Sequence, residues 1–297
     1  MWSSLFRLLP FEVVNAIRLL GKEITEIRIR RASYLCVTVV CCDDECVVFE
    51  NCELGVYISE AMMTRIVDAL TDHSLYSHEN TLKQGYITVQ GCYRVGIIGV
   101  CVCDGDTILH LKRVDSLCIR LWREIPGIAD DVYRYLKMLS FRGSMLIYSP
   151  PGKGKTTVLR DLARSLTQRF PHHRVALIDS REEIVTPQMV SLSHLDVLSG
   201  YPKAKGIEIA IRSLNPELIL CDEIGIDEGK SILECQRSGV PLIATAHGDS
   251  LDELLSHGTF YELYKNRYFD VYVKIESLKS NGNASYLFTS REEISVP

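Results

Sequence analysis

The segment from Ser149 to Thr157 has the residue types and the spacing of a phosphate-binding loop. Its sequence is SPPGKGKTT, and it follows an apolar stretch and opens a helical one, which is the strand–loop–helix context of a Walker A motif. Gly152 and Gly154 let the backbone curl around a phosphate, while backbone N–H groups at the helix N-terminus face the anion. Lys155 adds a full positive charge near the β- and γ-phosphates, and the hydroxyl of Thr156 is a ligand for Mg²⁺.

This segment predicts a site for ATP and Mg²⁺. Ser149 stands where the usual pattern begins with Gly, and the other defining positions are present. The nucleotide-binding residues that we expect are Ser149, Pro150, Pro151, Gly152, Lys153, Gly154, Lys155, Thr156 and Thr157.

A second motif, LILCDE at residues 218–223, is an apolar strand that ends in two carboxylates. Asp222 has the position of a Walker B aspartate, which holds Mg²⁺ through water. Glu223 is then placed to orient and deprotonate the attacking water. Two solvated acids at a strand end are the alternative, which the Walker A motif upstream disfavours.

The order of these parts indicates which branch of the P-loop proteins the chain belongs to. A complete strand, residues 174–179, lies between the two motifs, and an acid directly follows the Walker B aspartate. This arrangement is typical of RecA-like ATPases. GTPases and kinases of small metabolites place these parts differently.

Four further residues are candidates for catalytic roles. Thr245 and His247 end the strand at residues 241–246, and ligands bind at the carboxyl ends of such strands, so either one is a candidate to sense the γ-phosphate. Arg212 precedes the Walker B strand and is a candidate partner for a phosphate or for Glu223. Glu183 closes the DSREE segment and is a candidate to approach the attacking water. Solvated charges and a surface histidine are the alternatives.

The elements that must position these residues fall into two domains. Residues 1–125 predict an α+β domain, with helices over 12–20 and 59–71, the latter capped by Ser59, and strands at 24–30, 35–40, 46–49, 85–103 and 117–122. A helix over 128–139 follows, and strands at 144–149, 174–179, 218–222 and 241–246 then alternate with helices, which predicts a parallel sheet. A hairpin over 270–276 and 284–289 ends the chain. The fold class is therefore α/β, a RecA-like ATPase domain at residues 126–297 preceded by the smaller α+β domain.

Composition limits the choice of partners. The net charge of −5 disfavours a free-standing nucleic-acid binder. A membrane span needs about 20 apolar residues, and the longest apolar stretch, 95–103, falls far short, so we expect no direct membrane insertion. The N-terminus does not resemble a signal peptide, and we expect a cytoplasmic protein.

The chain has eleven cysteines, nine of them before residue 120. Cys41, Cys42, Cys46 and Cys52 are the candidates for a zinc site, but they lack the paired C-x2-C spacing of such sites. Most of the cysteines alternate with Val or Ile as strand residues do, so we expect them to pack in the core in a reducing compartment.

The C-terminal half resembles the type II/IV secretion ATPases, and the whole chain resembles more closely the stage III sporulation protein AA family. The first resemblance rests on the acidic segment after the second strand, Arg212, Asp222-Glu223 and Thr245-Ala246-His247. The second rests on motifs spread along the chain: 26–30 (EIRIR), 74–76 (SLY), 85–88 (GYIT), 93–96 (YRVG), 119–120 (IR), 123–124 (RE), 210–213 (AIRS), 216–217 (PE) and 244–248 (ATAHG). The sequence departs from the family pattern at Tyr93, Ser149, Ser180 and Glu182.

The resemblance implies a cytoplasmic ATPase of the mother cell of endospore-forming bacteria. It implies a homo-hexameric ring, peripheral to the forespore membrane through membrane-embedded channel proteins of the sporulation complex. In a ring, arginines of one subunit can stabilise charge on the γ-phosphoryl group bound by its neighbour. Arg94, Arg120 and Arg123 are the candidates for this role in trans; pairing with local acids, to hold the N-terminal domain together, is the alternative.

Three functions remain open from the sequence. The first is an ATP-driven motor for a secretion-type channel. The second is a nucleotide-binding assembly scaffold with little hydrolysis, which the presence of Glu223 disfavours. The third is a RecA-like motor directed at nucleic acid, which the acidic charge and the lack of an aromatic–basic stripe disfavour.

Overall fold

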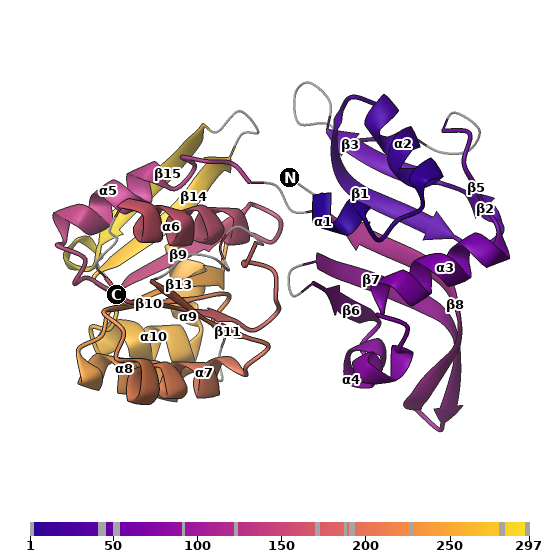
Figure 1. Ribbon diagram of the computed structural model, residues 1–297. Coiled ribbons are helices and arrows are strands. Elements are labelled where there is room, and N and C mark those ends of the chain that lie inside the picture. Colours follow the sequence, from indigo (N-terminus) through magenta and orange to yellow (C-terminus); the bar gives the residue numbers. More distant parts are fainter. Residues whose placement is uncertain are drawn as a thin grey trace. The chain divides into compact units, whose positions relative to one another are not determined.

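The computed structural model describes residues 3–40, 46–49, 54–90, 93–121, 124–169, 173–186, 189, 194–225, 228–278 and 283–294. The chain divides into two compact units, unit 1 (Met1–Arg123) and unit 2 (Glu124–Pro297), which Figure 1 colours from indigo to yellow along the sequence. We expected two domains that meet between residues 125 and 126, and their independent folding stays a prediction. Among the described residues, no helix is both long and apolar enough to cross a bilayer.

Unit 1 is built on an antiparallel sheet. The strand order is β4-β3-β1-β8-β7-β6. The strands are β1 (Glu23–Arg30), β3 (Cys36–Val40), β4 (Cys46–Phe49), β6 (Tyr86–Val89), β7 (Tyr93–Asp104) and β8 (Thr107–Arg120), and a small separate sheet pairs β2 (Ser33–Tyr34) with β5 (Tyr57–Ile58). Apolar and charged residues alternate along β1, so their side chains lie on opposite faces of the sheet. Ile27 and Ile29 are fully buried on one face, while Arg28 and Arg30 are exposed on the other.

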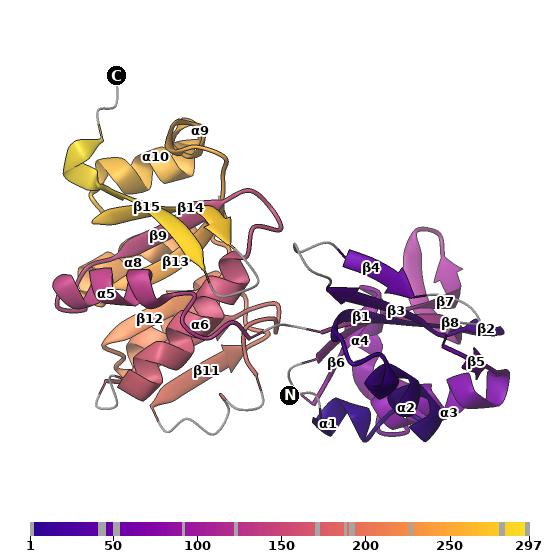
Figure 2. The same cartoon turned by 90° about the horizontal axis from the view of Figure 1, so that it is seen from above.

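Helices cover the buried face of this sheet. They are α1 (Ser3–Phe6), α2 (Phe11–Leu19), α3 (Glu60–Leu70) and α4 (Glu79–Leu82), with a 3-10 turn η3 (Leu75–His78) before α4. Figure 2 shows α1, α2 and α3 on one side of the sheet. The expected cap of α3 is present, because the side chain of Ser59 accepts a hydrogen bond from the N–H of Met62 at 3.2 Å. The resulting core contains Val13, Ile66 and Ile87, all fully buried.

Two expectations about unit 1 were wrong. The strand predicted at residues 117–122 begins ten residues earlier, at Thr107, and forms a long ribbon with β7. Cys101 and Cys103 lie on that ribbon and are exposed, not packed in the core, whereas Cys36, Cys221 and Cys235 are buried as expected. The candidate zinc ligands Cys41, Cys42 and Cys52 lie outside the described residues, and so does the side chain of Cys46.

Unit 2 contains the mostly parallel sheet that the sequence predicts. Its order is β11-β10-β12-β13-β9-β14-β15, parallel throughout except for the last pair. The strands are β9 (Met145–Ser149), β10 (Val175–Asp179), β11 (Leu195–Ser199), β12 (Leu218–Cys221), β13 (Leu242–His247), β14 (Val271–Leu278) and β15 (Ala284–Ser290). Of these strands, only the edge strand β11 lacked a signal in the sequence, because Asp196 and Ser199 interrupt its apolar residues.

Helices lie on both faces of this sheet (Figure 1), which is why its central strands are apolar throughout. On one face α5 (Asp130–Met138) and α6 (Lys155–Arg169) pack on Met145 and Ile147 of β9. On the other, residues of α7 (Lys203–Ile209), α8 (Gly229–Ser238), α9 (Leu251–Ser256) and α10 (Gly258–Lys265) join Leu146 and Tyr148. A π-helix, η4 (Ala210–Leu214), continues α7, and a 3-10 turn, η5 (Arg291–Glu293), follows β15.

Candidate functional site

The loop between β9 and α6 has the backbone that a phosphate cradle needs. β9 ends at Ser149 and α6 begins at Lys155. Between them, Gly152 and Gly154 have φ angles of +75° and +85°, which side-chain-bearing residues rarely adopt. A Cβ on Gly154 would also lie 2.5 Å from Cδ2 of Leu278. The loop thus requires glycine at both positions where the sequence has it.

Lys155 turns back over this loop. Its Nζ donates to the carbonyl oxygens of Ser149 at 2.7 Å and of Pro150 at 2.9 Å. The side chain is buried, and burial lowers the pKa of Lys155, an effect that the negative charge of Glu223 opposes. Thr156 and Thr157 follow in the first turn of α6 and are half-buried, whereas Pro151 and Lys153 are exposed at the loop surface.

Asp222 follows the end of β12 and is buried, with 6% of its surface exposed. Its Oδ1 is fully enclosed and has no hydrogen-bond partner among the residues that the structure describes. Burial raises the pKa of Asp222 to about 7, since a charge in this place is poorly solvated. The positive charges of Lys203 and Arg181 oppose this shift, and Oδ1 itself has no hydrogen-bond donor among the described residues.

Glu223 is held by groups from several segments. Its Oε2 lies 2.5 Å from Nη1 of Arg181, and its Oε1 lies 3.0 Å from Nε2 of His247. Its backbone N–H donates to the hydroxyl of Thr245 at 2.8 Å, and its carbonyl accepts from Nζ of Lys203. The backbone and the carboxylate of Glu223 are thus both fixed.

A buried network shapes the loop after β10. The carboxylate of Asp179 is fully buried and accepts hydrogen bonds from the N–H groups of Glu183, Ile184 and Val185, each at 3.0 Å. Arg160 of α6 donates to the carbonyl of Ile184 at 3.0 Å and to that of Glu183. Burial lowers the pKa of Arg160 to about 10, an effect opposed first by Asp179. Arg160 therefore connects α6, the helix after the phosphate loop, to the loop that carries Arg181.

The structure brings together most of the candidate residues in unit 2. Strands β9, β13 and β12 are parallel neighbours, so Ser149, His247 and Asp222 come to the same edge of the sheet. Arg212 differs from the expected pairing: it lies on η4, and its Nη1 pairs with Glu208 at 2.6 Å, not with Glu223. An arginine and a glutamate one helical turn apart meet readily, and this local pair accounts for the difference. The side chain of Glu183 is half-buried, and its backbone serves the Asp179 and Arg160 network.

Two of the candidate trans arginines lie side by side in unit 1. Arg94 of β7 and Arg120 of β8 flank the paired residues Val95 and Ile119. The guanidinium of Arg94 lies 3.9 Å from the ring centroid of Tyr86, and Arg120 faces Glu26 across β1 and β8. Arg123 lies outside the described residues.

Sequence reasoning missed three contacts of Glu223. Arg181 belongs to the DSREE segment, where its charge was the only available signal. Lys203 follows Tyr201-Pro202 and carries no motif. The hydroxyl of Thr245, a candidate to sense the γ-phosphate, accepts from the backbone N–H of Glu223, and its role toward the phosphate stays a prediction.

The residues present suit ATP with a divalent cation. The two positive-φ glycines and Lys155 form a cradle for phosphate, and the enclosed, unpartnered oxygen of Asp222 suits a cation that lies close to it. Carboxylate and hydroxyl oxygens are the ligands that Mg²⁺ prefers, so Asp222 and Thr156 stay the residues predicted to hold it.

A mostly parallel sheet with this loop at its carboxyl edge defines the P-loop ATPase fold of the secretion ATPases. The ATPase DotB of Legionella pneumophila aligns with a TM-score of 0.60 over 93% of this chain and 78% of its own. The pilus retraction motor PilT, solved with bound ADP, aligns with a TM-score of 0.62 over 94% of this chain and 82% of its own. Both are 14% identical to this chain in sequence, so these likenesses establish the fold.

The chain belongs to the family described as sporulation stage III, protein AA, whose family model matches residues 5–294. Stage III sporulation protein AA of Bacillus subtilis (strain 168) is 34% identical over 232 residues, which cover 75% of this chain and 75% of that protein.

Proposed function

We propose that this chain binds Mg-ATP at residues 149–157 and hydrolyses it, as the motor of a secretion-type channel in sporulation. The observation that carries the proposal is the convergence of three groups at one edge of the sheet: the glycine loop with Lys155, the carboxylate of Asp222 with its unpartnered Oδ1, and the fixed carboxylate of Glu223. The structural neighbours support an ATP-driven motor as well, since DotB is described as an ATPase and PilT as a pilus retraction motor.

Each residue has a distinct task in this proposal. Lys155 leaves the carbonyls of Ser149 and Pro150 to neutralise the β- and γ-phosphates. Glu223 accepts a proton from the attacking water, and Thr245 and His247 keep it in place for that step. Asp222 and Thr156 hold Mg²⁺, which offsets charge on the phosphate oxygens when it is bound.

Arg181 is the residue that must move for this reaction. Its ion pair occupies Oε2 of Glu223, one of the two oxygens that can accept the proton. About half of the Arg181 side chain is exposed (52%), so it is free to exchange this carboxylate for a phosphate. We expect Arg181 to join the γ-phosphate when ATP binds and to release Glu223 as it does so.

We further propose that the chain works as a homo-hexamer on the cytoplasmic side of the membrane around the forespore, docked on membrane-embedded channel proteins. Arg94, Arg120 and Arg123 then serve the nucleotide of a neighbouring subunit. The adjacency of Arg94 and Arg120 on β7 and β8 supports this, because two guanidinium groups together suit a triphosphate better than one. Roles for Arg212 and Glu183 in catalysis stay predictions.

A nucleotide-dependent assembly scaffold is the second candidate, and one observation favours it. Both carboxylate oxygens of Glu223 are already paired, with Arg181 and with His247. If that pairing persisted with ATP bound, hydrolysis would be too slow to drive transport.

Nucleotide binding and turnover of two variants, measured together, test the proposal. Lys155→Ala is expected to weaken ATP binding strongly, and Glu223→Gln to keep binding while lowering turnover at least about 100-fold. Lys137→Ala and Glu262→Gln, exposed on α5 and α10, are matched controls that should behave as the wild type. A wild-type turnover no faster than that of Glu223→Gln would favour the scaffold, and unchanged ATP binding in Lys155→Ala would contradict the site itself.

A further inference from the structure

The ribbon formed by β7 and β8 carries two cysteines whose sulfur atoms touch. Sγ of Cys101 and Sγ of Cys103 are 3.4 Å apart, and both residues are exposed. The described cysteines that pack in the cores, Cys36, Cys221 and Cys235, are by contrast buried. Neither Cys101 nor Cys103 belongs to the candidate ATP site, which lies in unit 2.

The strand geometry explains why these two sulfurs meet. Side chains two residues apart share a face of a strand, and a regular strand sets their Cα atoms about 6.6 Å apart, near the upper limit at which a disulfide can form. The pairing of β7 with β8 shifts between Val100 and Cys101 and again between Val102 and Cys103. Such bulges bend the strand locally, and here they turn the two thiols toward each other.

The contact couples the chemistry of the two thiols. The hydrogen bond with Cys101, then burial, raises the pKa of the Cys103 thiol. Either sulfur can be the donor in this contact, so either thiol can react first and the other then attacks it. An exposed thiolate with a second thiol in contact is the arrangement that resolves mixed disulfides.

We propose that Cys101 and Cys103 form a dithiol redox site that exchanges with low-molecular-weight disulfides. In the first step one of the two thiols loses its proton to solvent and attacks one sulfur of the small disulfide; a mixed disulfide forms and one small thiolate leaves, taking a proton from solvent. In the second step the other thiol loses its proton to solvent and attacks the cysteine sulfur of the mixed disulfide, and the second small thiolate leaves and is protonated. Two electrons pass from the dithiol to the small disulfide, which ends as two thiols.

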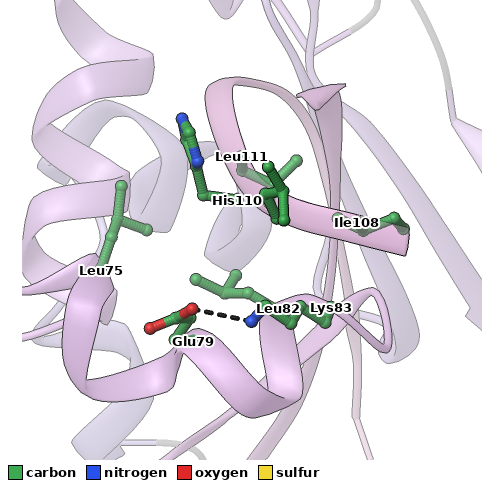
Figure 3. A pocket seen from close by; sticks show the side chains of 8 residues that line it. Leu75, Glu79, Leu82, Lys83, Ile108, His110 and Leu111 are labelled. Carbon is green, nitrogen blue, oxygen red and sulfur yellow. Dashed lines mark ion pairs between the residues drawn. The ribbon is translucent and has the colours of Figure 1, made fainter. Parts of the chain in front are cut away.

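The site is linked to an apolar groove of unit 1. Cys101 pairs across the ribbon with Leu111, and Cys103 with Ile108. Both partners line a groove that Leu75 and Leu82 close from the other side, with the Glu79–Lys83 ion pair at 2.7 Å, as Figure 3 shows. A disulfide between Cys101 and Cys103 forms on β7, the strand that pairs with the β8 wall of this groove.

Trypsin offers a clean measurement, because cleavage after Arg94 and Lys112 gives a peptide with Cys101 and Cys103 as its only cysteines. The folded full-length chain is treated with oxidised glutathione, and its remaining thiols are blocked with an alkylating agent. The chain is then digested with trypsin, and the mass of the peptide is measured by mass spectrometry. Cys101→Ser and Cys103→Ser are the test variants, and Val102→Ser, which keeps both thiols, is the matched control. Thermal unfolding of each variant confirms that it folds.

The wild-type and Val102→Ser peptides are expected to be lighter than the dithiol by the mass of two hydrogen atoms, and to regain them with dithiothreitol. Each Cys→Ser peptide is expected to keep glutathione on its remaining cysteine, at a level at least about tenfold above that in the wild type, since a neighbouring thiol resolves a mixed disulfide intramolecularly. Persistent glutathione on the wild-type peptide at the level of the variants, or full alkylation of both cysteines at every dose, would overturn the proposal. ATP binding and turnover need not be measured, so the result is independent of the proposed function.

Discussion

Glu223 receives contacts from three separate segments of unit 2. Arg181 comes from the loop after β10, Lys203 from the start of α7, and Thr245 with His247 from the end of β13. A general base must hold its oxygen within hydrogen-bond reach of the water that it deprotonates. The position of the Glu223 carboxylate therefore depends on residues that lie far from it in the sequence.

Replacing Thr245 tests this dependence. Thr245→Val is nearly isosteric but leaves the N–H of Glu223 without its acceptor, at a cost of about 1–3 kcal/mol. We expect kcat to fall about tenfold or more while the affinity for ATP stays nearly constant. Thr245→Ser keeps the hydroxyl and should restore most of the activity. Equal turnover in Thr245→Val and Thr245→Ser would show that the hydroxyl does not position Glu223.

Arg181 gives a second prediction at the same scale. If it moves from Glu223 to the γ-phosphate, Arg181→Ala should weaken the binding of ATP about tenfold and leave the binding of ADP nearly unchanged, because a charged hydrogen bond to phosphate contributes about 1.5–3 kcal/mol. Equilibrium binding of both nucleotides to the Glu223→Gln background measures this without turnover. An equal loss for ATP and ADP would contradict selective contact with the γ-phosphate.

At the scale of elements, α6 is tied to the loop after β10 by a buried cation. Arg160 is 6% exposed and donates to two backbone carbonyls of that loop, while Asp179 collects three N–H groups from it. Five backbone groups of a short irregular segment are thus satisfied by two side chains. This arrangement keeps Arg181 within reach of Glu223.

Arg160→Met should therefore destabilise unit 2. The substitution keeps the apolar stem but leaves the carbonyls of Glu183 and Ile184 without this donor. Because the charged guanidinium is no longer buried, part of the lost stability is recovered. We expect a decrease of about 1–3 kcal/mol in the free energy of unfolding, measured with urea on the nucleotide-free protein. Arg169→Met, a substitution on the same helix as Arg160 that breaks an exposed pair with Asp130 of α5, should cost less than about 1 kcal/mol. Equal losses would show that the loop does not depend on Arg160.

Elements with strong local signals were predictable from the sequence. β9, β10, β12 and β13 were expected within one residue of each end, because strands buried on both faces are continuous apolar runs. β11 was missed since its residues LDVLS are half polar at the sheet edge. The start of β8 was missed because residues 107–116 mix charged and apolar residues without strict alternation.

The chemistry of the site was predictable only where it is local in sequence. The phosphate loop and the Asp222-Glu223 pair are contiguous motifs, and the structure brings them to one edge of the sheet. The partners of Glu223 lie about 20 to 40 residues away along the chain, and nothing in a sequence ranks Arg181 above Arg212 as its partner. The exposure of Cys101 and Cys103 depends on how far the ribbon extends, which alternation with valine does not reveal.

At the scale of the whole molecule, each unit has a hydrophobic core of its own and a different part of the proposed machinery. Unit 2 holds the phosphate loop and the carboxylates, and unit 1 holds Arg94 and Arg120. If these arginines act on the nucleotide of a neighbouring subunit, the active unit is an assembly and not a single chain.

Mixing two inactive variants tests action in trans. Arg120→Ala lacks the arginine and Glu223→Gln lacks the base, so each alone should turn over little ATP. In randomly mixed rings, about one quarter of the interfaces pair an intact Glu223 with an intact Arg120 of the neighbour, and about that share of the wild-type rate should return. No rate above the sum of the two separate samples, or full activity of Arg120→Ala alone, would exclude this role for Arg120.

Assembly-dependent hydrolysis is measured most directly by the rate of ATP turnover per subunit over a wide range of protein concentrations, beside Lys155→Ala and Glu223→Gln. We expect a rate that rises with concentration as subunits assemble and that is absent from both variants at every concentration. A rate per subunit that is constant over the whole range would contradict an assembly-dependent motor. A rate that persists in Glu223→Gln would contradict the assignment of the base.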